Sequence, residues 1–251
     1  KPLFFCPQGC FAMKTLLRIF FYLLYHQFAF AYDLVAAAVS FNRWKDWVMS
    51  VLPFIEGKRV LEIGHGPGHL QHALLSRGML AVGIDESIQM GRLAKRNLRR
   101  AFLSQTQVTP LSNVSPQPVY AQESLTRGLA QHLPFPDETF DTVVATFPTE
   151  YIFDPETLIE TRRVLVPGGK FIILPGATIT GRSIVDRLLA WIFRVTGETP
   201  PDLSQIIHER SEERFAKTGF NVGVHEITVK SSLVFIMLAT SIQLREEEQN
   251  A

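Results

Sequence analysis

Glycines and carboxylates gather around the stretch VLEIGHGPGHL, residues 60–70, and give this sequence its clearest chemical signal. An apolar run precedes Gly64, Gly66 and Gly68, and Glu62 stands just before them. Glycine permits backbone conformations and close approaches that side chains block, so a strand running into such a turn is typical of backbone that passes close to a ligand. A second carboxylate, Asp85, ends the next apolar run. We therefore expect a ligand site where these two runs end.

The spacing of the glycines disfavours two common nucleotide-binding loops. A triphosphate-binding loop ends in Gly-Lys-Ser/Thr because the lysine neutralises phosphate charge, whereas this loop ends Gly68-His69-Leu70. A dinucleotide-binding loop has the spacing G-x-G-x-x-G, and His69 stands where its last glycine belongs. S-adenosylmethionine is the third ligand class that such turns hold, and the loop alone does not decide among the three.

Two further motifs decide the interpretation. LPFPDETFDTVVA spans residues 133–145, and RVLVPGGKFIIL spans residues 163–174. Together with the glycine loop and Asp85, they resemble the class I S-adenosylmethionine-dependent methyltransferases, in the type 11 subgroup with the signature LPF-x-D-x-x-FD. Within that subgroup the chain is similar to the ubiquinone/menaquinone biosynthesis C-methyltransferases. The resemblance extends over about residues 30–241.

The resemblance implies S-adenosylmethionine as the cofactor, S-adenosylhomocysteine as the product, and no metal. It places the glycines and Glu62 at the methionine end, Asp85 at the ribose, and Met90 and Ala130 at the adenine. Many relatives carry an acidic residue before that alanine, where this chain has Leu129, so adenine recognition is expected to rest on backbone and packing. The expected cofactor-binding residues are Glu62, Gly64, His65, Gly66, Gly68, Asp85, Glu86, Ser87, Met90, Leu129, Ala130, Thr146 and Phe147.

No catalytic residue is assigned, but four side chains are candidates. Tyr32 belongs to a Tyr-Asp pair that related quinone methyltransferases carry ahead of the first strand, and His65 lies within the glycine loop. Glu150 and Tyr151 follow a strand at the carboxyl edge of the expected sheet, where ligands bind in such folds. For each of the four, a structural role in packing or helix capping is the alternative to a catalytic one.

The elements that must position these residues alternate between strands and helices, which predicts an α/β fold. Strands are expected at 58–64, 79–85, 140–147 and 170–175, and helices at 69–78, 87–103 and 154–165. A short link between the runs 221–230 and 232–241 predicts an antiparallel hairpin at the sheet edge. The fold class is therefore a Rossmann-like, seven-stranded, mostly parallel sheet with an antiparallel C-terminal hairpin and a helical N-terminal cover.

The domain organisation follows from these elements. Residues 58–243 form the cofactor-binding methyltransferase domain, residues 13–57 a helical cover, and residues 244–251 a charged tail. Residues 1–12 are interpreted as a non-native or disordered leader, because Met13 reads as a natural start. Both cysteines lie in that leader, so a disulfide framework is not supported.

Net charge and the distribution of apolar and basic residues indicate which macromolecular partners to expect. The formal net charge is +1, which gives no global basic field for nucleic acid. The apolar stretches 14–31 and 183–195, each bordered by basic residues, are either packed on the domain or form a cover that meets a membrane surface. The basic run Lys95, Arg96, Arg99 and Arg100 is either a solvated helix face or a contact for anionic lipid headgroups. The oligomeric state is left open.

These observations predict an enzyme that transfers a methyl group to a small, lipophilic acceptor of quinone or lipid type. A soluble small-molecule O- or N-methyltransferase and a non-catalytic cofactor-binding module are the alternatives. The expected location is cytoplasmic, with peripheral contact on the inner face of the membrane.

Overall fold

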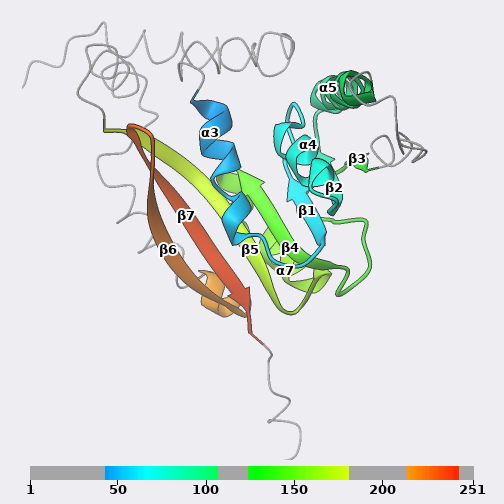
Figure 1. Cartoon of the computed structure of the whole chain (residues 1–251). Coiled ribbons are helices and arrows are strands. Elements are labelled where there is room, and N and C mark those ends of the chain that lie inside the picture. The colour runs from blue at the N-terminus through cyan, green and yellow to red at the C-terminus, as the bar shows by residue number, and fades with distance from the viewer. Residues whose placement is uncertain (1–42, 107–123, 181–213, 243–251) are drawn as a thin grey trace, which may run out of the picture.

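The computed structural model describes residues 43–106, 124–180 and 214–242 (Figure 1). The candidate Tyr32, the stretches 14–31 and 183–195, the leader, and the tail lie outside the described residues. The described helices are α3 (Trp44–Met49), α4 (His69–Ser76), α5 (Ile88–Thr106) and α7 (Pro155–Val164), with short 3-10 helices at η1 (Leu52–Phe54) and η2 (Glu150–Phe153). The strands are β1 (Arg59–Ile63), β2 (Leu80–Asp85), β3 (Leu125–Arg127), β4 (Phe140–Thr146), β5 (Leu165–Ile179), β6 (Phe220–Val229) and β7 (Ser232–Ser241).

The seven strands form one sheet in the order β3-β2-β1-β4-β5-β7-β6. Strands β1 to β5 are parallel, whereas β7 runs antiparallel to both β5 and β6. The chain builds the sheet outward from β1 in one direction through β2 and β3, and then in the other through β4 and β5. This reversal places a crevice at the carboxyl ends of β1 and β4, which is where ligands bind in open α/β sheets. The predicted fold class is confirmed.

Apolar side chains alternate across the sheet and form a core on each face. On one face, Trp47 and Val48 of α3 and Leu70 and Leu74 of α4 pack on the sheet. On the other, Leu158 of α7 joins Phe215, Phe220 and the strand residues of that face. In Figure 1, α3 crosses the near face of the sheet and the β6–β7 hairpin forms one edge. The two layers hold the sheet in place, so the polar residues at the carboxyl ends of β1, β2 and β4 meet at one edge.

Turn chemistry explains several boundaries. Gly78 has a φ of +72° just beyond α4, the left-handed conformation that commonly terminates a helix. Only Lys230 and Ser231 join β6 to β7, and Lys230 has a φ of +54°, as tight two-residue hairpin turns require. The helix α7 begins with Pro155 after Asp154 as expected, but the Asp154 side chain makes no capping hydrogen bond. It instead accepts one from the Gln131 amide at 3.3 Å.

Two strands differ from expectation. The three-residue β3 was not predicted, because it is too short to show an alternating pattern. β5 begins at Leu165 and includes the Pro-Gly-Gly sequence that was expected to precede it. Phe140 of β4 pairs with Leu165, and after a register shift Thr142 pairs with Lys170, so the strand tolerates those residues as an irregularity in the ladder.

Candidate functional site

A cavity of about 430 Å³ opens at the carboxyl ends of β1, β2 and β4, where the sheet order reverses. A cavity of this size falls within the range of small-molecule and cofactor sites. Its walls come from the glycine loop, the ends of β2 and β4, the loop after β3, and α3. The lining residues are Trp44, Val48, Glu62, Ile63, Gly64, His65, Gly66, Pro67, His69, Leu70, Ile84, Asp85, Glu86, Met90, Gly128, Leu129, Ala130, Gln131, Thr146, Phe147, Pro148, Thr149 and Tyr151.

The three glycines of the loop serve different purposes. Gly64 and Gly66 have φ values of +72° and +49°, and both line the cavity. A Cβ on Gly66 would meet no atom within 4 Å, so this position faces open space that a ligand can occupy. Gly68 has a φ of +83° at the start of α4, and a Cβ there would lie 3.0 Å from the Cβ of Ala94 on α5. Gly68 is absent from the cavity wall and permits close packing of the two helices.

Asp85 joins the two loops that border the cavity. Its Oδ2 accepts a hydrogen bond from the Gly66 backbone N–H at 2.9 Å, and its Oδ1 accepts one from the Ser87 N–H at 2.8 Å. Each carboxylate oxygen can accept a further bond. The side chain is therefore positioned by its own loops and keeps acceptor capacity toward the cavity. Ser87 itself does not line the cavity.

Glu62 is a buried carboxyl group with an unused acceptor. Its side chain is only 2% exposed, and among the described residues its Oε2 has no hydrogen-bond partner. Burial raises the pKa of Glu62 to about 8, the Asp85 charge adds to this effect, and hydrogen bonds from Gln71 partly offset it. A buried acceptor that lines a cavity and lacks a partner is best satisfied by a donor brought by a ligand, and a cationic donor would restore the carboxylate.

His65 is a packed neutral imidazole. Its Nδ1 lies 2.8 Å from the Gly66 carbonyl oxygen, which can only accept, so Nδ1 carries the proton. Burial lowers the pKa of the ring, and among the described residues its Nε2 has no partner. A Cβ on Gly83 would lie 3.0 Å from the His65 Cβ and Cδ2, so the ring packs over β2. His65 thus links the glycine loop to β2 and also lines the cavity.

An aromatic wall, formed by Trp44, Phe147 and Tyr151, closes the cavity beside the end of β4. The rings of Trp44 and Phe147 stack with centroids 4.0 Å apart and an interplanar angle of 29°. Phe147 has a φ of +50°, an unfavourable conformation for a bulky residue that persists only where its surroundings hold it. A Cβ on Gly64 would lie 2.9 Å from the Tyr151 hydroxyl, so Tyr151 reaches across to the glycine loop.

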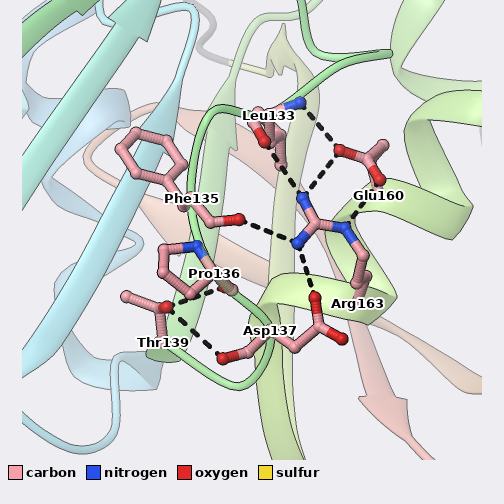
Figure 2. A network of polar contacts seen from close by, with 7 residues as sticks. All are labelled: Leu133, Phe135, Pro136, Asp137, Thr139, Glu160 and Arg163. Carbon is pink, nitrogen blue, oxygen red and sulfur yellow. Dashed lines mark hydrogen bonds and ion pairs between the residues drawn. The ribbon is translucent and has the colours of Figure 1, made fainter.

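The loop 133–137, which carries the first half of the signature, is held by one arginine of α7. The Arg163 guanidinium donates to the carbonyl oxygens of Leu133 and Phe135 at 3.0 and 2.8 Å, and to Asp137 at 2.7 Å. It also forms a two-bond contact with Glu160, at 2.8 and 2.9 Å, and Glu160 accepts from the Leu133 N–H at 2.8 Å (Figure 2). All five N–H groups of the guanidinium are used, a geometry only arginine offers.

The second half of the signature has a structural role as well. Asp141 accepts hydrogen bonds from the backbone N–H groups of Lys58 and Arg59, both at 2.9 Å, and pairs with the Arg59 guanidinium. The hydrogen bond from Arg59 lowers the pKa of Asp141 to about 2. A Cβ on Gly57 would lie 2.3 Å from the Asp141 Cβ, so glycine is required there. The signature therefore fixes the start of β1 against β4 and supplies no reacting group.

The structure brings most of the expected site residues together. Eleven of the thirteen expected cofactor-binding residues line the cavity, and Gly68 and Ser87 do not. Among the catalytic candidates, His65 and Tyr151 line it, whereas Glu150 is exposed outside the lining. The cavity also includes residues that motif reasoning missed, above all Trp44 and Gln131. The sequence did carry one signal for Trp44: its four-residue spacing from Val48 places both side chains on one face of a helix.

Comparison with known proteins identifies the family. Residues 61–173, from β1 into β5, match the methyltransferase domain family. The chain carries a class I S-adenosylmethionine-dependent methyltransferase domain. It is 27% identical to a demethylmenaquinone methyltransferase of Thermobifida fusca over 176 residues, 68% of this chain and 67% of that protein. It is 36% identical to a phosphatidylethanolamine N-methyltransferase of Cereibacter sphaeroides over 119 residues, 47% of this chain and 50% of that protein.

The fold of this methyltransferase agrees with solved structures. A methyltransferase from Aquifex aeolicus superposes with a TM-score of 0.52 at 16% identity, covering 80% of this chain and 93% of that one. The cofactor of the family is S-adenosylmethionine, and the cavity suits it: Gly66 leaves open space, Glu62 offers an unused buried acceptor, and Asp85 keeps acceptor capacity. Among the described residues, no helix is both long and apolar enough to cross a membrane.

Proposed function

We propose that this methyltransferase methylates a lipophilic acceptor with a flat apolar part, such as a reduced quinone ring. The observation that carries the proposal is the aromatic wall of Trp44, Phe147 and Tyr151, which lines the cavity at the end of β4. Aromatic rings bind flat apolar groups by offset stacking, with about 0.5–1.5 kcal/mol for each pair beyond area burial. The strained φ of Phe147 fits a site whose geometry is maintained for binding.

The cofactor is proposed to lie between the glycine loop and the loop after β3. In this arrangement Glu62 accepts from the methionine ammonium, Asp85 accepts from the ribose hydroxyls, and Met90, Leu129 and Ala130 border the adenine. Leu129 is 44% exposed and offers no acceptor, so the polar contacts to adenine are assigned to the backbone of the 128–131 loop.

When bound, the cofactor supplies an electrophilic methyl group on a sulfonium. The protein then has to align the acceptor with the methyl–sulfur bond and exclude water, and such positioning contributes about 7–11 kcal/mol in well-oriented reactions. On transfer the acceptor would bond the methyl carbon as the methyl–sulfur bond breaks, S-adenosylhomocysteine would leave, and the proton lost by the acceptor would pass to bulk water. Of the candidates described, Tyr151 stands at the end of β4 beside the glycine loop, whereas His65 is tied to the Gly66 carbonyl and packed over β2. We therefore assign contact with the acceptor to Tyr151.

The relatives support a lipophilic acceptor of one of two kinds. The name of the Thermobifida fusca protein refers to a quinone, and that of the Cereibacter sphaeroides protein to a phospholipid amine. The stacked wall favours the ring over the amine, because a headgroup amine offers no flat surface. We further propose that the enzyme is cytoplasmic and contacts the inner face of the membrane, where a lipophilic acceptor resides.

Transfer of a labelled methyl group tests the proposal. The purified chain is incubated with S-adenosylmethionine labelled on the methyl group and detergent micelles that contain either demethylmenaquinol or phosphatidylethanolamine. We expect label in the quinol product, and Trp44→Ala should raise the KM for the quinol with little change in the Kd for S-adenosylhomocysteine. Val222→Ala, on β6 and outside the cavity wall, serves as the matched control.

Three outcomes would contradict the proposal. Label confined to phosphatidylethanolamine would assign the enzyme to phospholipid N-methylation. Label found only in water-soluble compounds of a cell extract would support a soluble O- or N-methyltransferase. Tight S-adenosylhomocysteine binding without transfer to any fraction would indicate a cofactor-binding module.

A further inference from the structure

One face of α5 carries a stripe of positive charge that the cofactor site does not use. The stripe consists of Arg92, Lys95, Arg96, Arg99 and Arg100, which line a shallow groove of about 300 Å³ together with Leu103. Their spacing of three and four residues places all of them on one side of the helix. The opposite side, with Leu93, Ala94 and Leu98, is buried toward β3 and β2, so the basic stripe faces outward.

The stripe has no counter-charges within the described part of the chain. None of its five side chains forms an ion pair with another described residue. Elsewhere four basic side chains of the described residues form ion pairs: Arg59 with Asp141, Arg163 with Glu160 and Asp137, Lys170 with Glu56, and Lys230 with Asp46. Like charges three and four residues apart on a helix repel and destabilise it. A stripe of this kind is stabilised by a partner that brings several negative charges.

Apolar residues at both ends of the stripe narrow the choice of partner. Ile88, one turn before Arg92, is 44% exposed, and Leu103, one turn after Arg99, is 67% exposed. A nucleic acid would neutralise the cations through its phosphates but leave these two side chains in water. A bilayer surface accommodates both features, because its phosphates meet the cations and its interfacial region accepts the apolar side chains.

We propose that the basic stripe of α5 docks this methyltransferase on a membrane rich in anionic phospholipid. Met90, in the first turn of the same helix, and Glu86, two residues before the helix begins, line the cofactor cavity. Docking through α5 therefore sets the rim of the cavity beside the bilayer. This inference rests on the proposed function, since a lipophilic acceptor resides in that bilayer, and it adds the surface by which the enzyme reaches it.

Vesicle flotation of the full chain tests the stripe directly. Vesicles of phosphatidylcholine alone are compared with vesicles that contain about one third phosphatidylglycerol, at low and high salt. A cation near an anionic surface contributes about a fivefold change in partitioning, so Arg96→Gln combined with Arg100→Gln should weaken binding about 25-fold. The matched control, Lys58→Gln combined with Lys217→Gln, removes the same charge outside the stripe and should change binding less than twofold.

Two further readouts separate this inference from the proposed function. Both double variants should bind S-adenosylhomocysteine like the wild type, which shows that they fold and keep the cofactor site. Methyl transfer to acceptor in neutral detergent micelles should also be unchanged, because no anionic surface is present. If that transfer is absent in wild type while flotation depends on the stripe, the proposed acceptor is wrong and the docking surface stands.

The docking proposal fails under any of three results. Equal flotation of the stripe variant and wild type would overturn it, and so would equal binding to vesicles with and without phosphatidylglycerol. Binding to a DNA or RNA duplex without binding to vesicles would assign the stripe to nucleic acid instead.

Discussion

The protonation of Glu62 makes cofactor binding depend on pH in a predictable direction. With a pKa near 8, the carboxyl group is about nine-tenths protonated at pH 7 in the ligand-free protein. An ammonium group placed at its unused Oε2 favours the carboxylate, so binding must displace the proton. Below pH 8 each unit of acidification should therefore weaken binding up to tenfold, until the pKa of the bound state is reached.

S-adenosylhomocysteine is a suitable probe of this linkage because it carries the ammonium group but no transferable methyl. An α-amino group has a pKa of about 8, so the probe is cationic throughout the range from about pH 5.5 to 7. Across that range we expect the affinity to rise about 30-fold, provided that the bound-state pKa lies below the range. Calorimetry in buffers of different ionisation enthalpy should show release of nearly one proton at pH 7.

Glu62→Gln is the decisive variant. It keeps the shape and removes the charge, so binding should become weak, independent of pH and without proton release. The same change should stabilise the ligand-free protein. The raised pKa makes Glu62 destabilising above its unfolded pKa of about 4.5, and this penalty grows to roughly 3 kcal/mol at pH 7. The free energy of unfolding of the variant should therefore exceed that of wild type at pH 7, with the difference shrinking toward pH 4.5.

Glu226→Gln, which removes an exposed carboxyl group of β6, controls for charge and should change neither property. Wild-type affinity that stays flat between pH 5.5 and 7 would refute the assignment of the ammonium to Glu62. Wild-type affinity in Glu62→Gln would refute it as well, whatever the stability data show.

Three further predictions concern the scaffold and the loop. Asp141→Asn should cost about 2 kcal/mol of unfolding free energy at pH 7, because the depressed pKa of Asp141 stabilises the fold while the carboxylate is ionised. Urea titrations should show this loss vanish as the pH falls from about 4 to 2. A loss that persists at pH 2 would contradict the ion pair. Arg163→Lys should cost about 3 kcal/mol by thermal unfolding, since lysine cannot serve both loop carbonyls and Glu160, and Arg162→Lys should cost under about 1 kcal/mol. Gly66→Val should fold yet lose S-adenosylhomocysteine binding by calorimetry, and retained affinity would remove the loop from the site.

Much of the site could be predicted because its residues lie at the carboxyl ends of strands. Apolar periodicity located β1, β2 and β4, and parallel strands bring their carboxyl ends to one edge, so Glu62, Asp85 and Thr146 had to converge. The missed features are those that depend on partners distant in sequence. Nothing in the sequence around Leu133 indicates that its carbonyl is bound by Arg163, thirty residues later. Trp44 likewise enters the cavity wall only because α3 packs across the end of β4.

The roles of Gly68 and Asp85 show why a motif alone is an incomplete guide to function. Gly68 belongs to the glycine loop, yet what it accommodates is Ala94 of α5 rather than a ligand, and an alanine there would crowd Ala94 in a backbone conformation with a φ of +83°. Asp85 lies at the expected place for a ribose contact, but both of its oxygens already hold backbone N–H groups of the bordering loops. Removing its carboxylate would therefore release the Gly66 loop as well as the ribose. A loss of affinity in Asp85→Ala measures both effects together, and only the ammonium contact at Glu62, with its own proton signature, can be separated from the folding of the loop.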